Sequence, residues 1–156
     1  MQALKSKKRN LPEYISGFVD GEGCFSVSFS KRSKFLIGWE TKPSFSVSQN
    51  YDRAEVLFLM KEYFGCGFMR RDFSDRTLKY EIRRLNDLIE KVIPHFEKFP
   101  LLSAKNKDFL AFKKICHLMI DGKHTTKKGL RKILPIAFKM NSTGRRKYTK
   151  KDILNF

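Results

Sequence analysis

Cysteine is scarce in this sequence, and the cysteines that occur are isolated from one another. They are Cys24, Cys66 and Cys116, and no Cys-x-x-Cys pair is present. An odd number of scattered thiols argues against a disulfide framework and a cysteine-based zinc site, so we expect reduced thiols in core-like positions. The three histidines match neither His-Asn-His nuclease spacing nor an H-E-x-x-H metal site.

Long apolar runs are also absent. None approaches the roughly 18 residues that cross a bilayer, so the sequence predicts no membrane partner. The first ten residues are basic but lack the apolar core of a signal peptide. Phenylalanine, by contrast, is abundant, with 15 among 156 residues. This predicts a packed interior and a single domain over residues 1–156.

Acidic residues are half as common as basic ones. The chain has 16 Asp and Glu against 33 Lys and Arg, for a formal net charge of +17. Such an excess predicts a polyanionic partner that is bound with a steep dependence on salt. A ribosomal or chromatin-type binder would share this charge, so charge selects a class of partner and no more.

The segment Ile15–Gly23 reads as the end of a helix that leads directly into a strand. Asn10 is expected to cap the helix start, with Pro12 in the first turn, and the two glycines at its end stop it. Asp20 and Glu22 then stand where a helix gathers partial negative charge. Carboxylates at such a position favour a bound cation.

Small residues form two rows along the same helix. Ser16 with Asp20, and Gly17 with Gly21, are spaced four residues apart and let another backbone approach closely. The sequence therefore predicts that this helix packs against a second helix.

The rest of the chain predicts an α+β fold. Strands are expected at 24–30 and about 37–49, and a hairpin at 66–73 and 77–84, each alternating apolar and polar residues. Helices are expected at 52–64 with a capping box from Asp52, at 86–96 capped by Asn86 and broken or kinked in its last turn by Pro94, and at 104–121 capped by Ser103. This order predicts a four-stranded antiparallel sheet with helices on one face and a polar, basic face on the other.

The last 35 residues, 122–156, form a very basic extension. Apolar positions predict a helix bent at Pro135, then a turn at 141–144 and a short helix that is capped by Thr149 and ends near Phe156. Phosphate contacts that flank the main site are one role for this extension, and a merely solvating charge cluster is the alternative.

Ile15–Gly23 resembles the LAGLIDADG motif of homing endonucleases. Gly17, Asp20 and Gly23 match, Glu22 stands for the second acid, and apolar residues fill the positions between. The predicted element order is similar to the family's αββαββα core over roughly residues 8–120, in which a saddle-shaped sheet covers the DNA major groove. A later segment, 118–122, fails as a second motif, so the resemblance implies a homodimer that pairs its helices through Ser16, Gly17, Asp20 and Gly21.

The resemblance also implies catalytic roles. Glu22, with the carbonyl of Gly21, would hold Mg²⁺; Mn²⁺ could replace it, and Ca²⁺ would bind without turnover. Asp20 is interpreted as a structural brace. Gln49, Arg53 and Lys105 stand where the family has residues that orient solvent or steady charge, although Lys107 is an alternative to Lys105.

DNA contacts are implied for the polar sheet face. The positions are Ser26, Ser28, Ser30, Arg32, Glu40, Lys42, Ser46, Arg70, Lys79 and Glu81. Arg70 is predicted to read guanine, and Glu40 and Glu81 to accept from cytosine amino groups.

The sequence is thus interpreted as a metal-dependent, homodimeric endonuclease that cuts both strands of a long, partly palindromic duplex across the minor groove, leaving 3′ overhangs. Family members of this type are usually encoded in introns, so an organelle, chloroplast or mitochondrion, is the expected location. An RNA maturase, a DNA-binding regulator without nuclease activity and a ribosomal-type binder remain alternatives.

Overall fold

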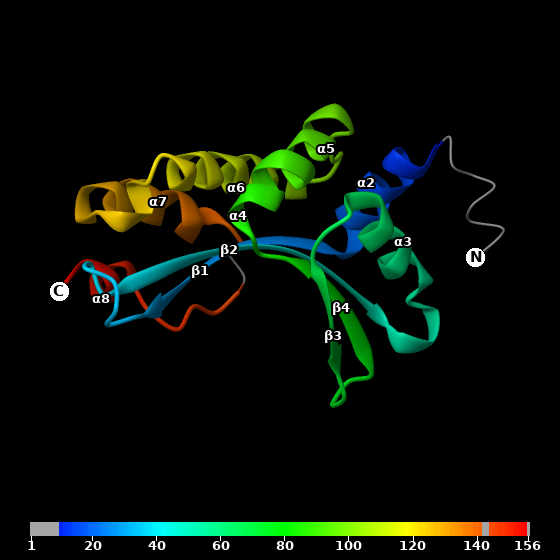
Figure 1. The fold of residues 1–156 in the computed structure, drawn as a ribbon, viewed down its shortest axis with the longest axis horizontal. Helices are drawn as coiled ribbons and strands as arrows, with labels where there is room; N and C mark the ends of the chain where they lie inside the picture. The colour runs from blue at the N-terminus through cyan, green and yellow to red at the C-terminus, as the bar shows by residue number, and fades with distance from the viewer. Residues whose placement is uncertain (1–9, 142–143, 156) are drawn as a thin grey trace.

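The computed structural model describes residues 10–141 and 144–155, and its first half repeats a helix followed by two strands (Figure 1). The elements of this half are α2 (Leu11–Glu22), β1 (Gly23–Lys31), β2 (Trp39–Asn50), the 3₁₀ turn η2 (Tyr51–Arg53), α3 (Glu55–Phe64), β3 (Phe68–Asp72) and β4 (Thr77–Ile82). The strands pair antiparallel in the order β1-β2-β4-β3. The predicted α+β class and four-stranded sheet are confirmed.

The second half of the chain is helical. Its elements are α4 (Leu85–Asp87), the π-helical turn η3 (Leu88–Val92), α5 (Ile93–Lys98), α6 (Lys105–Ile120), the 3₁₀ turn η4 (Lys123–Thr125), α7 (Lys127–Lys139) and α8 (Lys150–Leu154). Figure 1 shows α6 and α7 lying along one side of the curved sheet, while the β3–β4 hairpin extends away from them. None of the helices in the described ranges is long and apolar enough to cross a membrane.

The core lies between the sheet and these helices. Along β1, Phe25 and its neighbours on the same face are buried, because alternate residues of a strand point to opposite faces. The ring of Phe25 lies 5.3–5.4 Å, centroid to centroid, from four other phenylalanine rings, those of Phe45, Phe96, Phe109 and Phe112. Each such pair contributes about 0.5–1.5 kcal/mol beyond its buried area. The helices therefore cover one face of the sheet and leave the serine-bearing face open.

Some of the predicted helix caps are present in the structure and others are not. Asn10 and Asn86 make no capping hydrogen bond, and the capping box from Asp52 is wrong because η2 intervenes and α3 begins at Glu55. Ala104 is the residue that directly flanks α6, but the Ser103 hydroxyl accepts from the N–H of Lys105 at 3.2 Å while it donates to Asp20, so Ser103 helps to cap this helix as predicted. Thr149 does cap α8 in a full capping box.

The helix that contains Pro94, which was predicted to break or kink there, continues past it. Pro94 lies at the start of α5, directly after the π-helical turn η3. Proline has no N–H and its ring clashes with the carbonyl four residues earlier, so a wider turn lets the chain continue. The helix consequently runs on to Lys98 and carries His95 into the interior.

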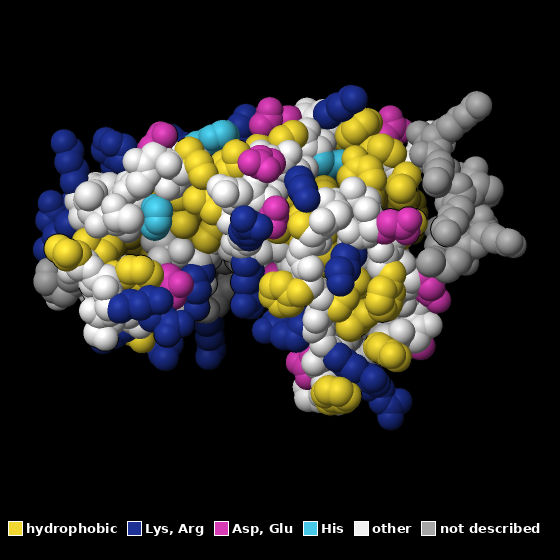
Figure 2. All heavy atoms as spheres, in the orientation of Figure 1, with side chains coloured by type: hydrophobic (Ala, Val, Ile, Leu, Met, Phe, Trp, Pro, Cys, Tyr) yellow, Lys and Arg dark blue, Asp and Glu magenta, His cyan; other side chains and the backbone are white. Residues whose placement is uncertain are grey.

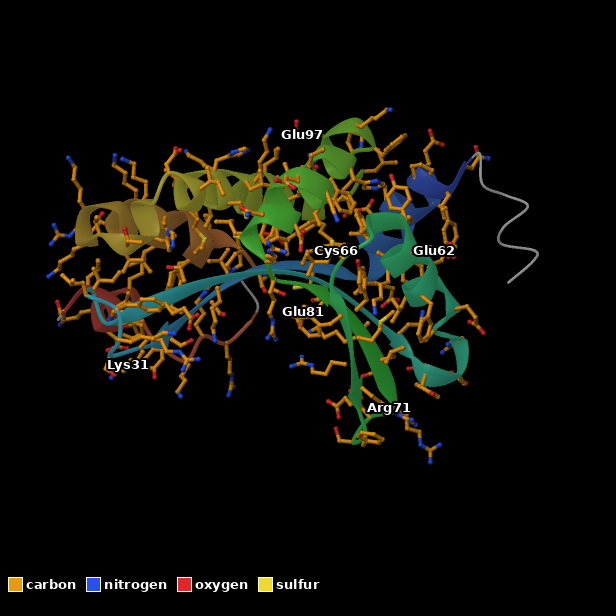
Figure 3. The ribbon with its side chains drawn as sticks, in the orientation of Figure 1. Lys31, Glu62, Cys66, Arg71, Glu81 and Glu97 are labelled. Carbon is orange, nitrogen blue, oxygen red and sulfur yellow. The ribbon has the colours of Figure 1, made fainter. Side chains whose placement is uncertain are left out.

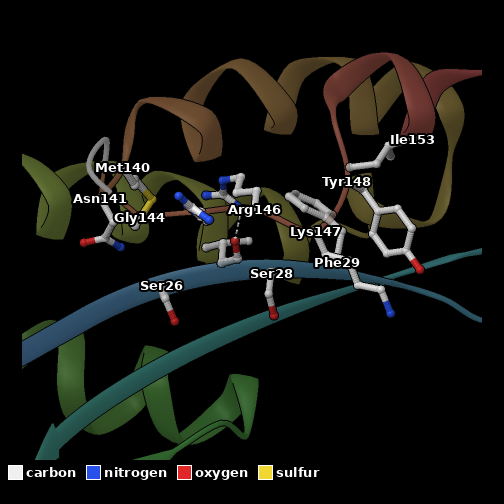
Figure 4. Close-up of a pocket in the computed structure, with 12 residues that line it drawn as sticks. Ser26, Ser28, Phe29, Met140, Asn141, Gly144, Arg146, Lys147, Tyr148 and Ile153 are labelled. Atoms are coloured by element: carbon white, nitrogen blue, oxygen red, sulfur yellow. Dashed lines mark hydrogen bonds between the residues drawn. The ribbon is translucent and has the colours of Figure 1, made fainter.

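The C-terminal extension covers the outer edge of β1. The side chain of Asn141 donates to the carbonyl of Phe25 at 2.7 Å, and Arg146 donates to that of Val27 at 2.8 Å. Figure 4 shows this segment beside β1, with Arg146 directed at the strand. An uncovered edge would invite strand pairing with other chains, which these contacts prevent. Ser142, Thr143 and Phe156, part of the predicted turn and final helix, lie outside the described residues.

Candidate functional site

The C-terminal end of α2 carries the exposed carboxylate of Glu22. The chain turns into β1 at Gly23, where an added Cβ would lie 2.5 Å from Cγ1 of Val19 and 2.8 Å from its carbonyl oxygen. Only glycine fits there, which explains the last glycine of the motif. The tight turn leaves Glu22 at the junction between helix and sheet.

Lys105 lies at the same helix end although it is 86 residues away from Val19 in the sequence. Its ammonium group donates to the carbonyl oxygen of Val19 at 2.9 Å. A cation is favourable there because the last carbonyls of a helix carry partial negative charge. The structure thus brings Lys105 to the acid-bearing end of α2, as its assigned role requires.

Asp20 joins α2 to the segment that precedes α6. Its carboxylate accepts from the backbone N–H groups of Leu102 and Ser103, each at 3.0 Å, and from the Ser103 hydroxyl. The hydroxyl hydrogen bond is the largest cause that holds the pKa of Asp20 below its ordinary value. The carboxylate braces the segment that precedes α6, two residues before Lys105, which agrees with a structural role for Asp20.

Gln49 and Arg53 follow at the same end of the sheet. Gly23 pairs with Val47, so Gln49 lies two residues beyond the point where α2 joins the sheet. Its side chain accepts from the N–H of Asn50 at 2.9 Å. Arg53 is exposed at the end of η2. Strand register therefore places Gln49 close to the end of α2, while Arg53 follows four residues later on η2.

The predicted helix-pairing face needs one correction. Ser16 is only 5% exposed and donates to the carbonyl of Phe99 at 2.6 Å, so it belongs to the interior of its own chain. Asp20 is likewise engaged within the chain. Gly17 and Gly21 are exposed, and an added Cβ at either would meet nothing within 4 Å. Only the glycine row remains open to a partner.

A buried histidine lies behind this face, and nothing in the sequence pattern pointed to it. Nε2 of His95 lies 3.0 Å from the Ser16 hydroxyl, and Nδ1 lies 2.9 Å from the Tyr63 hydroxyl. Because the single hydrogen of Ser16 goes to Phe99, Nε2 must donate to Ser16, and Nδ1 accepts from Tyr63. Burial lowers the pKa of His95 to about 4, so the ring is neutral at neutral pH.

The polar face of the sheet carries the predicted DNA contacts in rows across the strands. Ser28 pairs with Lys42, Ser30 with Glu40, and Lys79 with Arg70. Figure 2 shows Lys and Arg side chains gathered along the lower margin of the view, below the sheet. Ser28, Arg32, Lys42 and Arg70 are exposed, and Ser26, Ser30, Glu40 and Lys79 are partly exposed. The hydroxyl oxygen of Ser30 is itself buried, so it is not available to a ligand on this face.

Two members of the predicted set, Ser46 and Glu81, are buried, at 5% and 3% exposed. The carboxylate of Glu81 accepts from Ser44 at 2.6 Å and from Arg83 at 2.7 Å. Its acceptor oxygens are thus engaged within the chain, and we withdraw the cytosine contact predicted for it. Glu40 is partly exposed and pairs with Arg32, with 2.9 Å between nitrogen and oxygen.

The basic extension contributes to this surface beside β1. Ser26 and Ser28 line a pocket together with Asn141, Arg145 and Lys147 (Figure 4). Arg145 and Lys147 are exposed. Arg146 between them is structural, because it donates to two backbone carbonyls and lies 4.6 Å from the ring of Phe138.

Comparison with known proteins matches this arrangement to a family. The sequence profile of the LAGLIDADG endonucleases matches residues 15–116, from the helix that bears Glu22 to the helix that bears Lys105. The chain belongs to the LAGLIDADG endonuclease family.

Relatives within the family include proteins that are much longer than this chain. The LAGLIDADG chain is 36% identical over 124 residues to "Probable intron-encoded endonuclease 2" of Neurospora crassa, covering 79% of this chain but 27% of that protein. It is 32% identical over 128 residues to "DNA endonuclease I-CeuI" of Chlamydomonas moewusii, covering 79% of this chain and 59% of that protein.

Solved structures show the same fold. The crystal structure of the homing endonuclease I-TnaI is 41% identical, with a TM-score of 0.80, over 85% of this chain and 89% of that one. The I-LtrWI LAGLIDADG homing endonuclease bound to target DNA is 35% identical, with a TM-score of 0.83, over 85% of this chain and 45% of that one. The saddle of this LAGLIDADG chain is thus a fold seen on DNA in a relative.

Proposed function

We propose that this chain is a site-specific homing endonuclease that hydrolyses both strands of a long, partly palindromic DNA duplex as a homodimer. The observation that carries this proposal is that Glu22 and the ammonium group of Lys105 both lie at the C-terminal end of α2, next to an open polar face of the sheet. The matched relatives named intron-encoded endonucleases support it. The chain, residues 1–156, would act as one LAGLIDADG unit encoded within an organellar intron.

The donor set at the end of α2 fits a hard divalent cation. Glu22 offers an exposed carboxylate, and Gly21 offers a backbone carbonyl in the last turn of the helix. Among the described residues, no group of three or more His, Cys, Asp or Glu side chains could hold a metal ion. One carboxylate per chain suits Mg²⁺, which keeps several waters and binds substrate oxygens. When bound, Mg²⁺ supplies charge neutralisation and a nucleophilic water.

The neighbouring side chains would act on the scissile phosphate and the attacking water. The ammonium of Lys105, held by the carbonyl of Val19, would stabilise negative charge that develops in the transition state. The Gln49 amide would orient a water, and the Arg53 guanidinium would attract the phosphate. Hydrolysis would leave a 3′ hydroxyl and a 5′ phosphate, with short 3′ overhangs where two chains cut opposite strands.

The exposed side of α2 supports the proposed homodimer. Gly17 and Gly21 leave room for a second helix, and Leu102 beside them is 95% exposed. Leu102 also borders a groove of about 340 Å³ against α2 that Gly17 and Pro100 help to line. Pairing two chains here would bury Leu102 and place one Glu22 on each side of the contact.

A cleavage assay on a randomised duplex library with Mg²⁺ tests this function. Glu22→Gln is expected to abolish cutting and to keep binding in Ca²⁺, because the charge is lost but the side-chain shape remains. Glu62→Gln, which removes an exposed carboxylate from α3, is the matched control and should cut normally.

The alternatives give different results in the same assay. Specific duplex binding without cleavage in the wild type would indicate a regulator, and action on intron RNA alone would indicate a maturase. A wild type that cuts equally well without a divalent metal would overturn the proposed mechanism.

A further inference from the structure

Glu81 is a buried acid in the middle of the basic sheet face. Figure 3 labels it beneath the sheet, on the side away from the helices. It pairs in register with Ser46 on one neighbouring strand and with Phe68 on the other. An unpaired carboxylate at such a position would cost several kcal/mol of folding free energy, so Glu81 requires the residues that pair with it.

Arg83 is its main partner. Nε of Arg83 donates to one carboxylate oxygen at 2.7 Å, and Nη2 donates to the other at 3.1 Å. Ser44 donates a third hydrogen bond at 2.6 Å. Burial raises the pKa of Glu81, but the hydrogen bonds from Arg83 and Ser44 outweigh this effect, and its pKa lies below the ordinary value. Glu81 is therefore a fixed negative charge.

This pairing leaves one edge of the guanidinium unused by Glu81. Glu81 occupies the edge formed by Nε and Nη2, so the edge formed by Nη1 and the second hydrogen of Nη2 still points away from it. The Arg83 side chain is 52% exposed, and its guanidinium lies 5.2 Å from the ring of Phe68. The planar fork is thus held in orientation on the open face.

Arg70 is held less firmly. Its Nη2 lies 3.9 Å from the Glu81 carboxylate, which is an ion pair but not a hydrogen bond. The sequence pattern favoured Arg70 for reading guanine because arginine is the commonest bidentate partner of the major-groove edge of that base. A rigid bidentate donor discriminates between bases better than a mobile one, because less side-chain entropy is lost on contact.

We propose that Arg83 is a specificity-determining residue that reads a guanine in the major groove of the target, and that Glu81 is the positioning residue that holds its guanidinium. The free edge of Arg83 matches the O6 and N7 acceptors of guanine, which arginine contacts in pairs. This inference rests on the proposed function, because it takes duplex DNA as the ligand.

Site selection from a randomised duplex library in Ca²⁺ buffer tests the proposal. The wild type should select a site with guanine at a defined position in each half. Arg83→Ala should lose that preference by about tenfold or more, while preferences at other positions remain. Arg83→Lys should not restore it, since lysine lacks the planar fork. Glu81→Gln should weaken the preference at the same position, because it loosens Arg83.

Arg84→Ala is the matched control. Arg84 is the neighbouring exposed cation, so its loss should weaken binding evenly without changing base preference. The inference is overturned if Arg83→Ala weakens all sequences equally, or if Arg83→Lys restores wild-type preference, since either marks a phosphate contact. A wild type that selects no sequence would instead overturn the proposed function. Thermal unfolding of each variant distinguishes loss of folding from loss of base preference. If Glu81→Gln does not fold, Arg83→Ala alone tests the proposal.

Discussion

The ammonium of Lys105 lies 2.9 Å from the carbonyl oxygen of Val19, which joins the first turn of α6 to the last turn of α2. Asp20 makes a second connection between the same segments through the N–H groups of Leu102 and Ser103. The two contacts run in opposite directions. An acid of α2 accepts from the segment before α6, and a lysine of α6 donates to a carbonyl of α2. The end of α2 and Lys105 are therefore held as one unit.

Replacement of Lys105 should slow cleavage far more than it weakens binding. Lys105→Ala is expected to lower the cleavage rate about 100-fold or more, because a preorganised donor to the transition state is lost. Lys107→Ala is the control and should cut normally, because Lys107 is an exposed lysine two residues further along α6. Single-turnover cleavage and filter binding measure the two effects. Equal loss of rate in both variants would contradict the assignment of Lys105.

The motif glycines should separate into two classes. Gly23→Ala should destabilise the chain, because its Cβ would lie 2.5 Å from Val19. Gly17→Ala should keep or raise the stability of the monomer by up to about 1 kcal/mol, since alanine favours helix and its Cβ meets open space. The same variant should weaken dimerisation. Chemical denaturation and sedimentation velocity measure these properties, and a Gly17→Ala dimer as tight as wild type would exclude the proposed helix pairing.

The stability of the fold should depend on pH through His95. Its pKa falls from the ordinary 6.5 to about 4 on folding, so the unfolded chain binds one more proton between these values. The free energy of unfolding should therefore be fully retained above pH 6.5 and fall by about 1.4 kcal/mol per pH unit as the pH drops toward 4. Denaturation curves of wild type and His95→Gln measure this contribution. An unchanged slope in the variant would assign the effect to other groups.

The C-terminal extension should contribute phosphate contacts through Arg145 and Lys147. The double variant Arg145→Ala/Lys147→Ala should reduce the slope of log affinity against log salt by about 2, because two counterion-releasing contacts are lost. Base preference should stay the same. Arg146→Ala should instead lower stability, since Arg146 donates to the carbonyls of Val27 and Ala137. A salt slope equal to that of wild type would favour the solvating role for these charges.

Much of the fold followed from local patterns. The alternation around Phe25 predicted β1, and Gly65, in a left-handed conformation, ends α3 as expected. The helix starts were less predictable, because the local sequence does not fix the residue at which regular helical turns begin. Asp52 is the clearest example, since it lies in the 3₁₀ turn η2 and α3 begins only at Glu55.

The sequence by itself determined the motif that bears Glu22, the basic character of the chain, and the order of helices and strands, because these depend on residue identity and spacing along the chain. Tertiary structure alone decided which charges remain available. The sequence pattern predicted a base contact for Glu81, but in the structure Glu81 is buried and hydrogen-bonded to Arg83. The pattern predicted no role for His95, whose ring contacts the hydroxyl groups of Ser16 and Tyr63. The physical reason is that hydrogen-bond partners and desolvation come from residues distant in sequence, which a local pattern does not specify.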